Sequence, residues 1–249
     1  MIEMIRSLLL LAGIAAAAIP ASGAFAGTRD CGAPSELTED APELPVLAER
    51  FRTKQPVTIV AIGGASTAGN ATENAARDAY PKRLQDSLER RHPEVPITVL
   101  NKGVARQTTA EMVERFPRDV FALSPALVIW ETGTFDAARS VDVDVFATAL
   151  AAGLAELRQH KLDIMLINMQ YSRSTASVIN FEPYLDAMQQ TADVEDVYVF
   201  RRFETMRYWS ETGVFNFLDV PKDKRAPFAA EVYECLADRL ADAIDRAMR

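Results

Sequence analysis

Five short apolar runs alternate along the chain with longer amphipathic segments. The runs have the length of buried strands and cover residues 58–62, 97–100, 126–130, 164–169 and 197–200. Residues 80–92 place Tyr80, Leu84 and Leu88 on one face of a helix, and residues 144–160 are amphipathic with the same period. Strands that alternate with helices predict an α/β domain, with a five-stranded parallel sheet covered by helices on both faces.

A ligand site in such a sheet is expected beyond the carboxyl ends of the strands. The segments that meet there are 63–70, 101–109, 131–139, 170–175 and 201–203. Hydroxyl residues stand where new helices should begin, and such residues are typical helix caps. Thr108 or Thr109 is predicted to cap the helix after the second strand. Ser66 or Thr67 is predicted to cap the helix after the first.

The N-terminal residues have the pattern of a secretory signal. Residues 8–19 form a short apolar core, and Ala24-Phe25-Ala26 resembles a cleavage site. We therefore expect residues 1–26 to be a signal peptide and the protein to be exported, periplasmic or secreted, with no stable membrane span after cleavage. A membrane anchor is the alternative. Residues 27–50 are predicted to be an N-terminal extension, and residues 51–249 the domain.

Charge and cysteine content limit the classes of function that the chain can have. The 249-residue chain has a formal net charge of −8, which argues against nucleic-acid binding. Its two cysteines, Cys31 and Cys235, suggest one disulfide in an exported protein, with two unpaired thiols as the alternative. No cluster of His, Cys and Asp has metal-ligand spacing, so we expect neither a metal nor another cofactor.

Three sequence blocks, in order, resemble those of one enzyme superfamily. They are "IGGASTAG", "VLNKGVARQTT" and "LVIWETGTFDA", each at the carboxyl end of a predicted strand. In this respect the chain resembles the SGNH, or GDSL-like, hydrolases, which are esterases and acyl hydrolases. The resemblance implies a flavodoxin-like, three-layer α/β sandwich and an ancestry in ester hydrolysis.

The same resemblance implies that the catalytic positions have changed. The nucleophilic serine, an oxyanion-binding glycine and the oxyanion asparagine fall on Ala65, Arg106 and Phe135, and the closing segment before the last helix has no histidine. The chain's two histidines, His92 and His160, end helices that precede strands, so we expect them at the opposite edge of the sheet. The chain therefore resembles a degenerate member that lacks all four catalytic residues.

Arginines after several strand ends suggest another use for the site, because guanidinium groups bind carboxylate and phosphate well. The candidate ligand-binding residues are Ser66, Asn101, Arg106, Glu131, Asp136 and Arg173. Alternatively, the arginines, Arg201 and Arg202 among them, pair with nearby acids such as Glu131. We expect Phe135 to fill the former oxyanion site.

An aromatic cluster precedes the last helix, formed by Tyr208, Trp209, Phe215 and Phe217. It could form a wall on which a sugar stacks. The alternative is that it packs a long loop onto the core.

Three functions remain open. The first is an exported, non-catalytic protein that binds an envelope ligand at the carboxyl ends of the strands, such as an anionic or acylated glycan, or a partner. The second is an active esterase or acyl hydrolase in which Ser66 is a displaced nucleophile and Asp136 a base; Glu131 and Asp136 as a glycosidase-like pair is a variant of this idea. The third is a structural component of an envelope complex.

Overall fold

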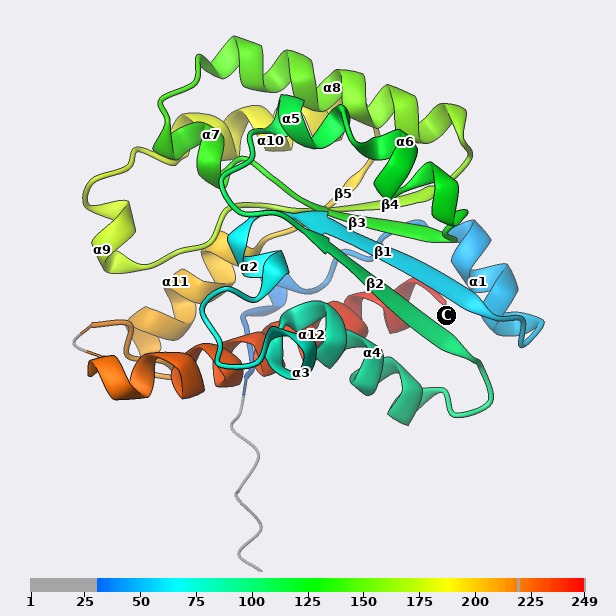
Figure 1. Ribbon diagram of the computed structural model, residues 1–249, viewed down its shortest axis with the longest axis horizontal. Coiled ribbons are helices and arrows are strands. Elements are labelled where there is room, and N and C mark those ends of the chain that lie inside the picture. The colour runs from blue at the N-terminus through cyan, green and yellow to red at the C-terminus, as the bar shows by residue number, and fades with distance from the viewer. Residues whose placement is uncertain (1–30, 219, 249) are drawn as a thin grey trace, which may run out of the picture. The chain divides into compact units, whose positions relative to one another are not determined.

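One parallel sheet organises residues 31–218 and 220–248, the part of the chain that this computed structural model describes (Figure 1). Its strands are β1 (Val57–Gly63), β2 (Ile97–Gly103), β3 (Leu127–Glu131), β4 (Asp163–Ile167) and β5 (Tyr198–Phe200). Their order is β2-β1-β3-β4-β5, and every neighbouring pair is parallel. The five predicted strands and the parallel α/β fold are confirmed.

Helices of very different lengths connect these strands. They are α1 (Pro45–Arg52), α2 (Ala65–Ala68), α3 (Ala75–Asp78), α4 (Tyr80–Arg91), α5 (Thr109–Val113), α6 (Phe116–Asp119), α7 (Thr134–Ala138), α8 (Val143–Gln159), α9 (Arg173–Ala176), α10 (Glu182–Val194), α11 (Arg202–Thr212) and α12 (Arg225–Ala247). Three short 3₁₀ helices are η1 (Ser35–Leu37), η2 (Phe121–Leu123) and η3 (Lys222–Lys224). The predicted face of α4 is confirmed, since Tyr80, Leu84 and Leu88 are fully buried. Thr108 caps α5 and forms a capping box with Glu111.

Helices cover both faces of the sheet (Figure 1), and a hydrophobic core lies on each face. Val60 and Ile62 of β1 belong to the core beneath α5, α6, α8 and α10, whereas Ile59 and Ala61 belong to the core on the side of α4 and α12. This alternation follows from the two-residue period of a strand. Because helices cover both faces, β3 and β4 are buried along their whole length, which explains their continuous apolar sequence.

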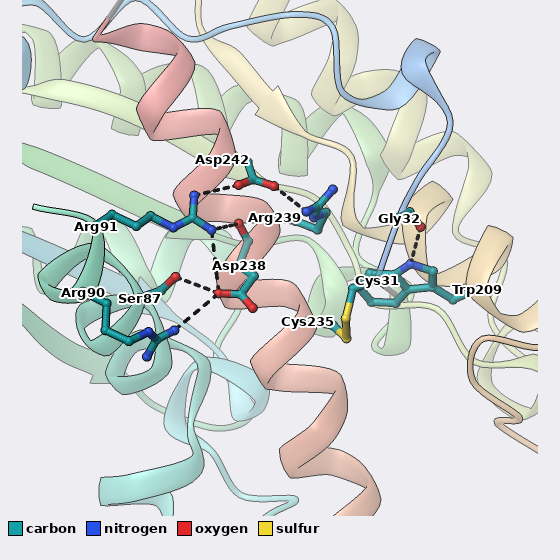
Figure 2. Close-up of a disulfide and its surroundings, with 10 residues drawn as sticks. All are labelled: Cys31, Gly32, Ser87, Arg90, Arg91, Trp209, Cys235, Asp238, Arg239 and Asp242. Carbon is teal, nitrogen blue, oxygen red and sulfur yellow. Dashed lines mark hydrogen bonds and ion pairs between the residues drawn. A yellow bond between two sulfur atoms is a disulfide. The ribbon is translucent and has the colours of Figure 1, made fainter. Parts of the chain in front are cut away.

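The N-terminal part of the described chain is fastened to the C-terminal helices (Figure 2). Cys31 forms a disulfide with Cys235 of α12, with 5.5 Å between their Cα atoms. The indole Nε1 of Trp209 donates a hydrogen bond to the Gly32 carbonyl oxygen, 3.0 Å away. The predicted disulfide is therefore present.

Helix α1 lies across the boundary predicted at residue 50. Leu44 and Leu47 are buried, and the Asp163 carboxylate at the start of β4 accepts hydrogen bonds from the amides of Val46 and Leu47, at 3.3 and 2.7 Å. The end of the predicted extension thus packs with the domain. The predicted signal peptide lies outside the described residues. None of the helices described is both long and apolar enough to cross a bilayer.

Helices α4 and α12 are joined by polar contacts along their shared side (Figure 2). The Ser87 hydroxyl donates to the Asp238 carboxylate at 2.7 Å, and an Arg91 guanidinium nitrogen lies 2.6 Å from the Asp242 carboxylate. These contacts fix α12, and with it the disulfide, against the sheet.

Candidate functional site at the carboxyl edge of the sheet

The turn after β1 is too tight for side chains at its glycines. A Cβ atom on Gly63 would lie 2.2 Å from the Thr67 hydroxyl oxygen, and one on Gly103 would lie 2.1 Å from the Ala68 amide nitrogen. Both glycines let α2 pack closely on the ends of β1 and β2. Ala65 is the first residue of α2 and is exposed, so an exposed methyl group follows this turn.

Ser66, the next residue, is turned into the protein. Its side chain is buried, and its hydroxyl donates a hydrogen bond to Glu131 Oε2 at 2.7 Å. The Ser66 hydroxyl oxygen in turn accepts a hydrogen bond from Arg202 Nη1 at 2.8 Å. The prediction that Ser66 or Thr67 caps α2 is wrong, because the N-cap is Gly64 and no side chain caps the helix. The Ser66 and Thr67 hydroxyls instead donate to the buried Glu131 carboxylate, and a hydrogen bond to a charged acceptor is stronger than one between neutral groups.

Glu131 and Arg202 form a buried ion pair at the end of β3. Arg202 Nη2 lies 3.1 Å from Glu131 Oε1, and the two side chains are 1% and 3% exposed. Thr67 donates to Glu131 Oε2 through its hydroxyl at 2.5 Å and through its amide at 3.2 Å. Tyr80 joins through a 3.1 Å contact between its hydroxyl and that of Thr67. We call Ser66, Thr67, Tyr80, Glu131 and Arg202 the Glu131 network.

The charges of the Glu131 network shift the pKa values of its members. Burial alone would raise the pKa of Glu131, but the Arg202 charge and the hydrogen bonds from Thr67 and Ser66 outweigh it, so this pKa lies below its ordinary value. Burial, together with the Glu131 charge, raises the pKa of Tyr80 and of Tyr233 far above the ordinary value. Glu131 is therefore an ionised and weakly basic carboxylate.

Asp136 is held in a second, separate arrangement. Its carboxylate is 1% exposed and accepts bonds from the Thr109 amide, at 3.1 Å to each oxygen, and from the Thr109 hydroxyl at 3.0 Å. That hydroxyl also lies 2.6 Å from the Thr132 hydroxyl. Burial raises the pKa of Asp136 despite these bonds. Asp136 thus joins α7 to α5. Because its carboxylate is buried, it does not form with Glu131 a glycosidase-like pair that is accessible to a substrate.

The other predicted site residues lie on the surface. Arg106 is exposed, with a φ of 65°, and forms no ion pair among the residues described. Arg173 on α9 is exposed as well. Asn101 is exposed but bound, since its amide nitrogen donates to the Thr67 carbonyl at 2.7 Å and its oxygen accepts from the Gly103 amide at 2.9 Å. Six residues predicted to form one ligand site therefore divide into three buried and three exposed ones.

Phe135 does not fill a buried cavity as predicted. Its side chain is only half-buried, and the Arg139 guanidinium carbon lies 5.6 Å from the centroid of its ring. On the short helix α7 the neighbouring Asp136 takes the inward position, so Phe135 faces outward. In the aromatic cluster before α12, Trp209 and Phe215 are fully buried, with 5.4 Å between their ring centroids. They pack the loop onto the core and cannot stack on a sugar.

Both histidines lie far from this edge, as predicted. His92 follows α4 just before β2, and its Nε2 lies 2.8 Å from an Asp245 carboxylate oxygen. His160 follows α8 just before β4 and stacks on Phe121 at 3.6 Å between ring centroids. In a parallel sheet, positions that precede strands lie at the amino edge. No imidazole can therefore reach Ser66.

Two cavities of the described chain lie away from Ala65. One of about 530 Å³ lies at the amino ends of β4 and β5. Another, of about 450 Å³, lies beside α9 and is lined by Tyr171, Phe203 and Arg207. Neither is lined by Ala65, Ser66, Arg106 or Phe135. In the described residues, no three His, Cys, Asp or Glu side chains are grouped so as to hold a metal ion.

Residues 30–249 match the model of the Non-GDSL lipase-like family. The chain belongs to this family. Its fold is that of the SGNH/GDSL-like hydrolases, as the sequence blocks indicated. No curated protein matches the chain.

Solved structures share this fold at low sequence identity. A two-domain esterase active on acetylated mannans, co-crystallised with mannopentaose, is similar with a TM-score of 0.67 and 16% identity; the match covers 84% of this chain and 56% of that one. An acetylxylan esterase from Geobacillus stearothermophilus has a TM-score of 0.59 and 18% identity, covering 77% and 94%. A lipase/acylhydrolase from Enterococcus faecalis has a TM-score of 0.56 and 18% identity, covering 74% and 96%. The chain thus spans little more than half of the two-domain esterase.

Sequence reasoning had left the role of Arg202 open. Both possibilities, an anion-binding arginine at the rim and a partner of Glu131, were compatible with its place after a strand. The structure decides for the second, because Arg202 is the start of α11 and its side chain points inward to Glu131. The role of Thr67 as a second hydroxyl donor to Glu131 had no sequence signal beyond its place in the turn.

Proposed function

We propose that this protein is a non-hydrolytic member of its family that binds an anionic ligand at the carboxyl edge of the sheet. The observation that carries the proposal is the turn after β1. Ala65, which has no hydroxyl, takes the exposed first position of α2, and the adjacent Ser66 is buried between Glu131 and Arg202. An ester at this turn would meet no nucleophile.

The electrostatics around Ser66 also argue against a displaced active site. A serine nucleophile needs a base that removes its proton, and among the described residues the acidic group within hydrogen-bond distance of Ser66 is Glu131. The lowered pKa of Glu131 makes it a poor base. Loss of the serine or histidine of a triad lowers turnover by about a million-fold. We therefore expect ester hydrolysis at the background rate.

The surface charge at this edge favours an anion. Glu131 is neutralised by Arg202, and Asp136 is buried, whereas the guanidinium groups of Arg106 and Arg173 are exposed. These two guanidinium groups are therefore accessible at the edge where ligands bind in this class of sheet. For an exported protein, an anionic or acylated glycan of the envelope is the ligand class that we infer, and the acetylated-glycan esterases among its structural neighbours support a carbohydrate.

Hydrolysis and binding are tested separately. Wild type and Ser66→Ala are assayed with p-nitrophenyl acetate and with acetylated xylan, and we expect both proteins to show only the uncatalysed rate. Binding to acidic and acylated oligosaccharides is measured by calorimetry, with Arg106→Ala and Arg173→Ala expected to weaken it. Turnover that disappears in folded Ser66→Ala would favour an active esterase, whereas wild-type binding unchanged by both arginine variants would remove the proposed site.

The third function, an envelope assembly component, is tested with the same variants. A partner recovered by pull-down from the periplasm that binds wild type and the two arginine variants equally would favour a structural role. A partner lost with Arg106→Ala would instead place the binding at the carboxyl edge.

A further inference from the structure

Strand β5 forms one edge of the sheet. It is the last strand in the order, and within residues 31–218 and 220–248 it pairs with β4 alone. Residues 31–44 lead from the disulfide to α1, yet no backbone hydrogen bond joins them to β5 in the part of the chain that the structure describes. An exposed edge of this kind is a template for another strand unless charge or a covering segment blocks it.

A groove of about 530 Å³ opens at this edge. Tyr198 and Val199 of β5 line it together with Asp163 and Ile164 at the start of β4. Residues 40–43 border it on one side, and the end of α10 borders it on the other. The groove has the volume of many small-molecule sites, but it is open and includes the edge strand itself. An extended segment of a few residues fits this form better than an enclosed ligand does.

The charges around the groove are mainly negative. Four exposed carboxylates line it, and none of them forms an ion pair with another described residue; they are Asp40, Glu43, Asp193 and Asp196. A fifth, Asp163, is already bound to the amides at the start of α1. Of the two arginines in the lining, Arg158 lies 3.1 Å from Glu195, which leaves Arg201 as the cation without an acidic partner in the described part.

We propose that the β5 edge binds a basic, extended segment of a partner protein, which adds to the sheet as a sixth strand. Backbone hydrogen bonds to β5 supply the register, and lysine or arginine side chains of the segment face the four carboxylates. A second copy of this chain is disfavoured as the occupant, because two acidic grooves would repel each other in a protein with a net charge of −8. This site lies at the amino edge of β4 and β5 and is independent of the proposed ligand site at the carboxyl edge.

The test uses a capped six-residue peptide of alternating lysine and valine, and fluorescence anisotropy as the readout. Two further peptides separate charge from strand pairing: one has glutamate in place of lysine, and the other is N-methylated at alternate residues so that it cannot pair as a strand. We expect binding of the first peptide, and at least about tenfold weaker binding of the other two in about 0.15 M salt.

The variants are chosen to leave the fold intact. In Asp193→Asn/Asp196→Asn both residues are exposed, and asparagine tolerates the φ of 49° at residue 196. The matched control, Glu114→Gln/Glu211→Gln, removes the same charge from exposed positions outside the groove. We expect about tenfold weaker peptide binding in the first variant and none of this loss in the control.

Several outcomes would overturn the proposal. No binding of the lysine–valine peptide removes the site, and equal binding of the N-methylated peptide reduces it to a non-specific charge effect. An equal loss of peptide binding in the control variant Glu114→Gln/Glu211→Gln would also reduce the site to a non-specific charge effect. Concentration-dependent dimers in sedimentation that Asp193→Asn/Asp196→Asn strengthens would assign the edge to a second copy of the chain.

Discussion

Arg202 Nη2 lies 3.1 Å from Glu131 Oε1, at the end of a sheet strand and almost out of contact with water. Ser66 and Thr67 complete the hydrogen bonding of this carboxylate. The pair therefore occupies the space beneath α2 with two buried charges that compensate each other. A serine hydrolase would need a base here whose pKa lies near the working pH, whereas the pKa of Glu131 is lowered.

Removal of one partner from this ion pair should be costly. Glu131→Gln leaves the Arg202 charge buried without compensation, and we expect a loss of about 3–5 kcal/mol in the free energy of unfolding. Arg202→Met should have a similar effect, and the double variant Glu131→Leu/Arg202→Met should lose much less than the sum of the two single variants. Urea unfolding measures all three.

The exposed pair Glu49–Arg52 is the control for this prediction. Glu49→Gln should leave the unfolding midpoint unchanged, since surface ion pairs contribute little. If the losses in the free energy of unfolding of the two single variants add up to that of the double variant, Glu131 and Arg202 are not coupled in solution.

Acidification should lower the free energy of unfolding through protonation of Glu131. Its pKa is lower in the folded protein than in the unfolded chain, where glutamate titrates near about 4.3. Its contribution is therefore fully present above that pH, and it is lost as the pH falls from there through the lower folded value. We expect the stability gap between wild type and Glu131→Gln to narrow in this range, as followed by urea unfolding at successive pH values. A gap that widens on acidification would mean that the pKa is raised.

The disulfide should contribute to stability because it closes a loop of 204 residues. In Cys31→Ser/Cys235→Ser we expect a loss of about 2–5 kcal/mol, measured by chemical unfolding. A thiol reductant should lower the melting temperature of wild type toward that of the variant. The variant itself serves as the control, since its melting temperature should not respond to the reductant. A response of the variant would indicate an effect unrelated to the disulfide.

Arg106 combines backbone strain with a proposed binding role. Its φ of 65° lies in the left-handed region, which costs most residues about 1–2 kcal/mol and glycine very little. Arg106→Gly should therefore match or exceed wild type in thermal stability, while its affinity for the anionic ligand falls. Arg106→Ala should lose the ligand without that gain. If Arg106→Gly binds the ligand as well as wild type does, the guanidinium group has no role in binding.

Local patterns in the sequence predicted most of the sheet and the helix faces. The apolar run of β1 and the helical spacing of Tyr80, Leu84 and Leu88 depend only on neighbours along the chain. Helix α1 was missed because residues 27–50 were predicted to be an extension. It begins at Pro45, and proline is well suited to the first turn of a helix.

The candidate site was less predictable, because its contacts join distant segments. Ser66 meets Glu131 and Arg202 across 65 and 136 residues, so no local pattern could show that it is turned inward. Phe135 was misplaced for a related reason. The direction of its side chain depends on Asp136 docking against Thr109, 27 residues earlier in the chain.

The most direct test of the central claim is reaction with a fluorophosphonate, which labels activated serines covalently, followed by intact-mass analysis and peptide mapping. The account predicts unmodified protein, because Ala65 has no hydroxyl and Ser66 is held by Glu131 and Arg202. A stoichiometric adduct on Ser66 of the folded protein would contradict it.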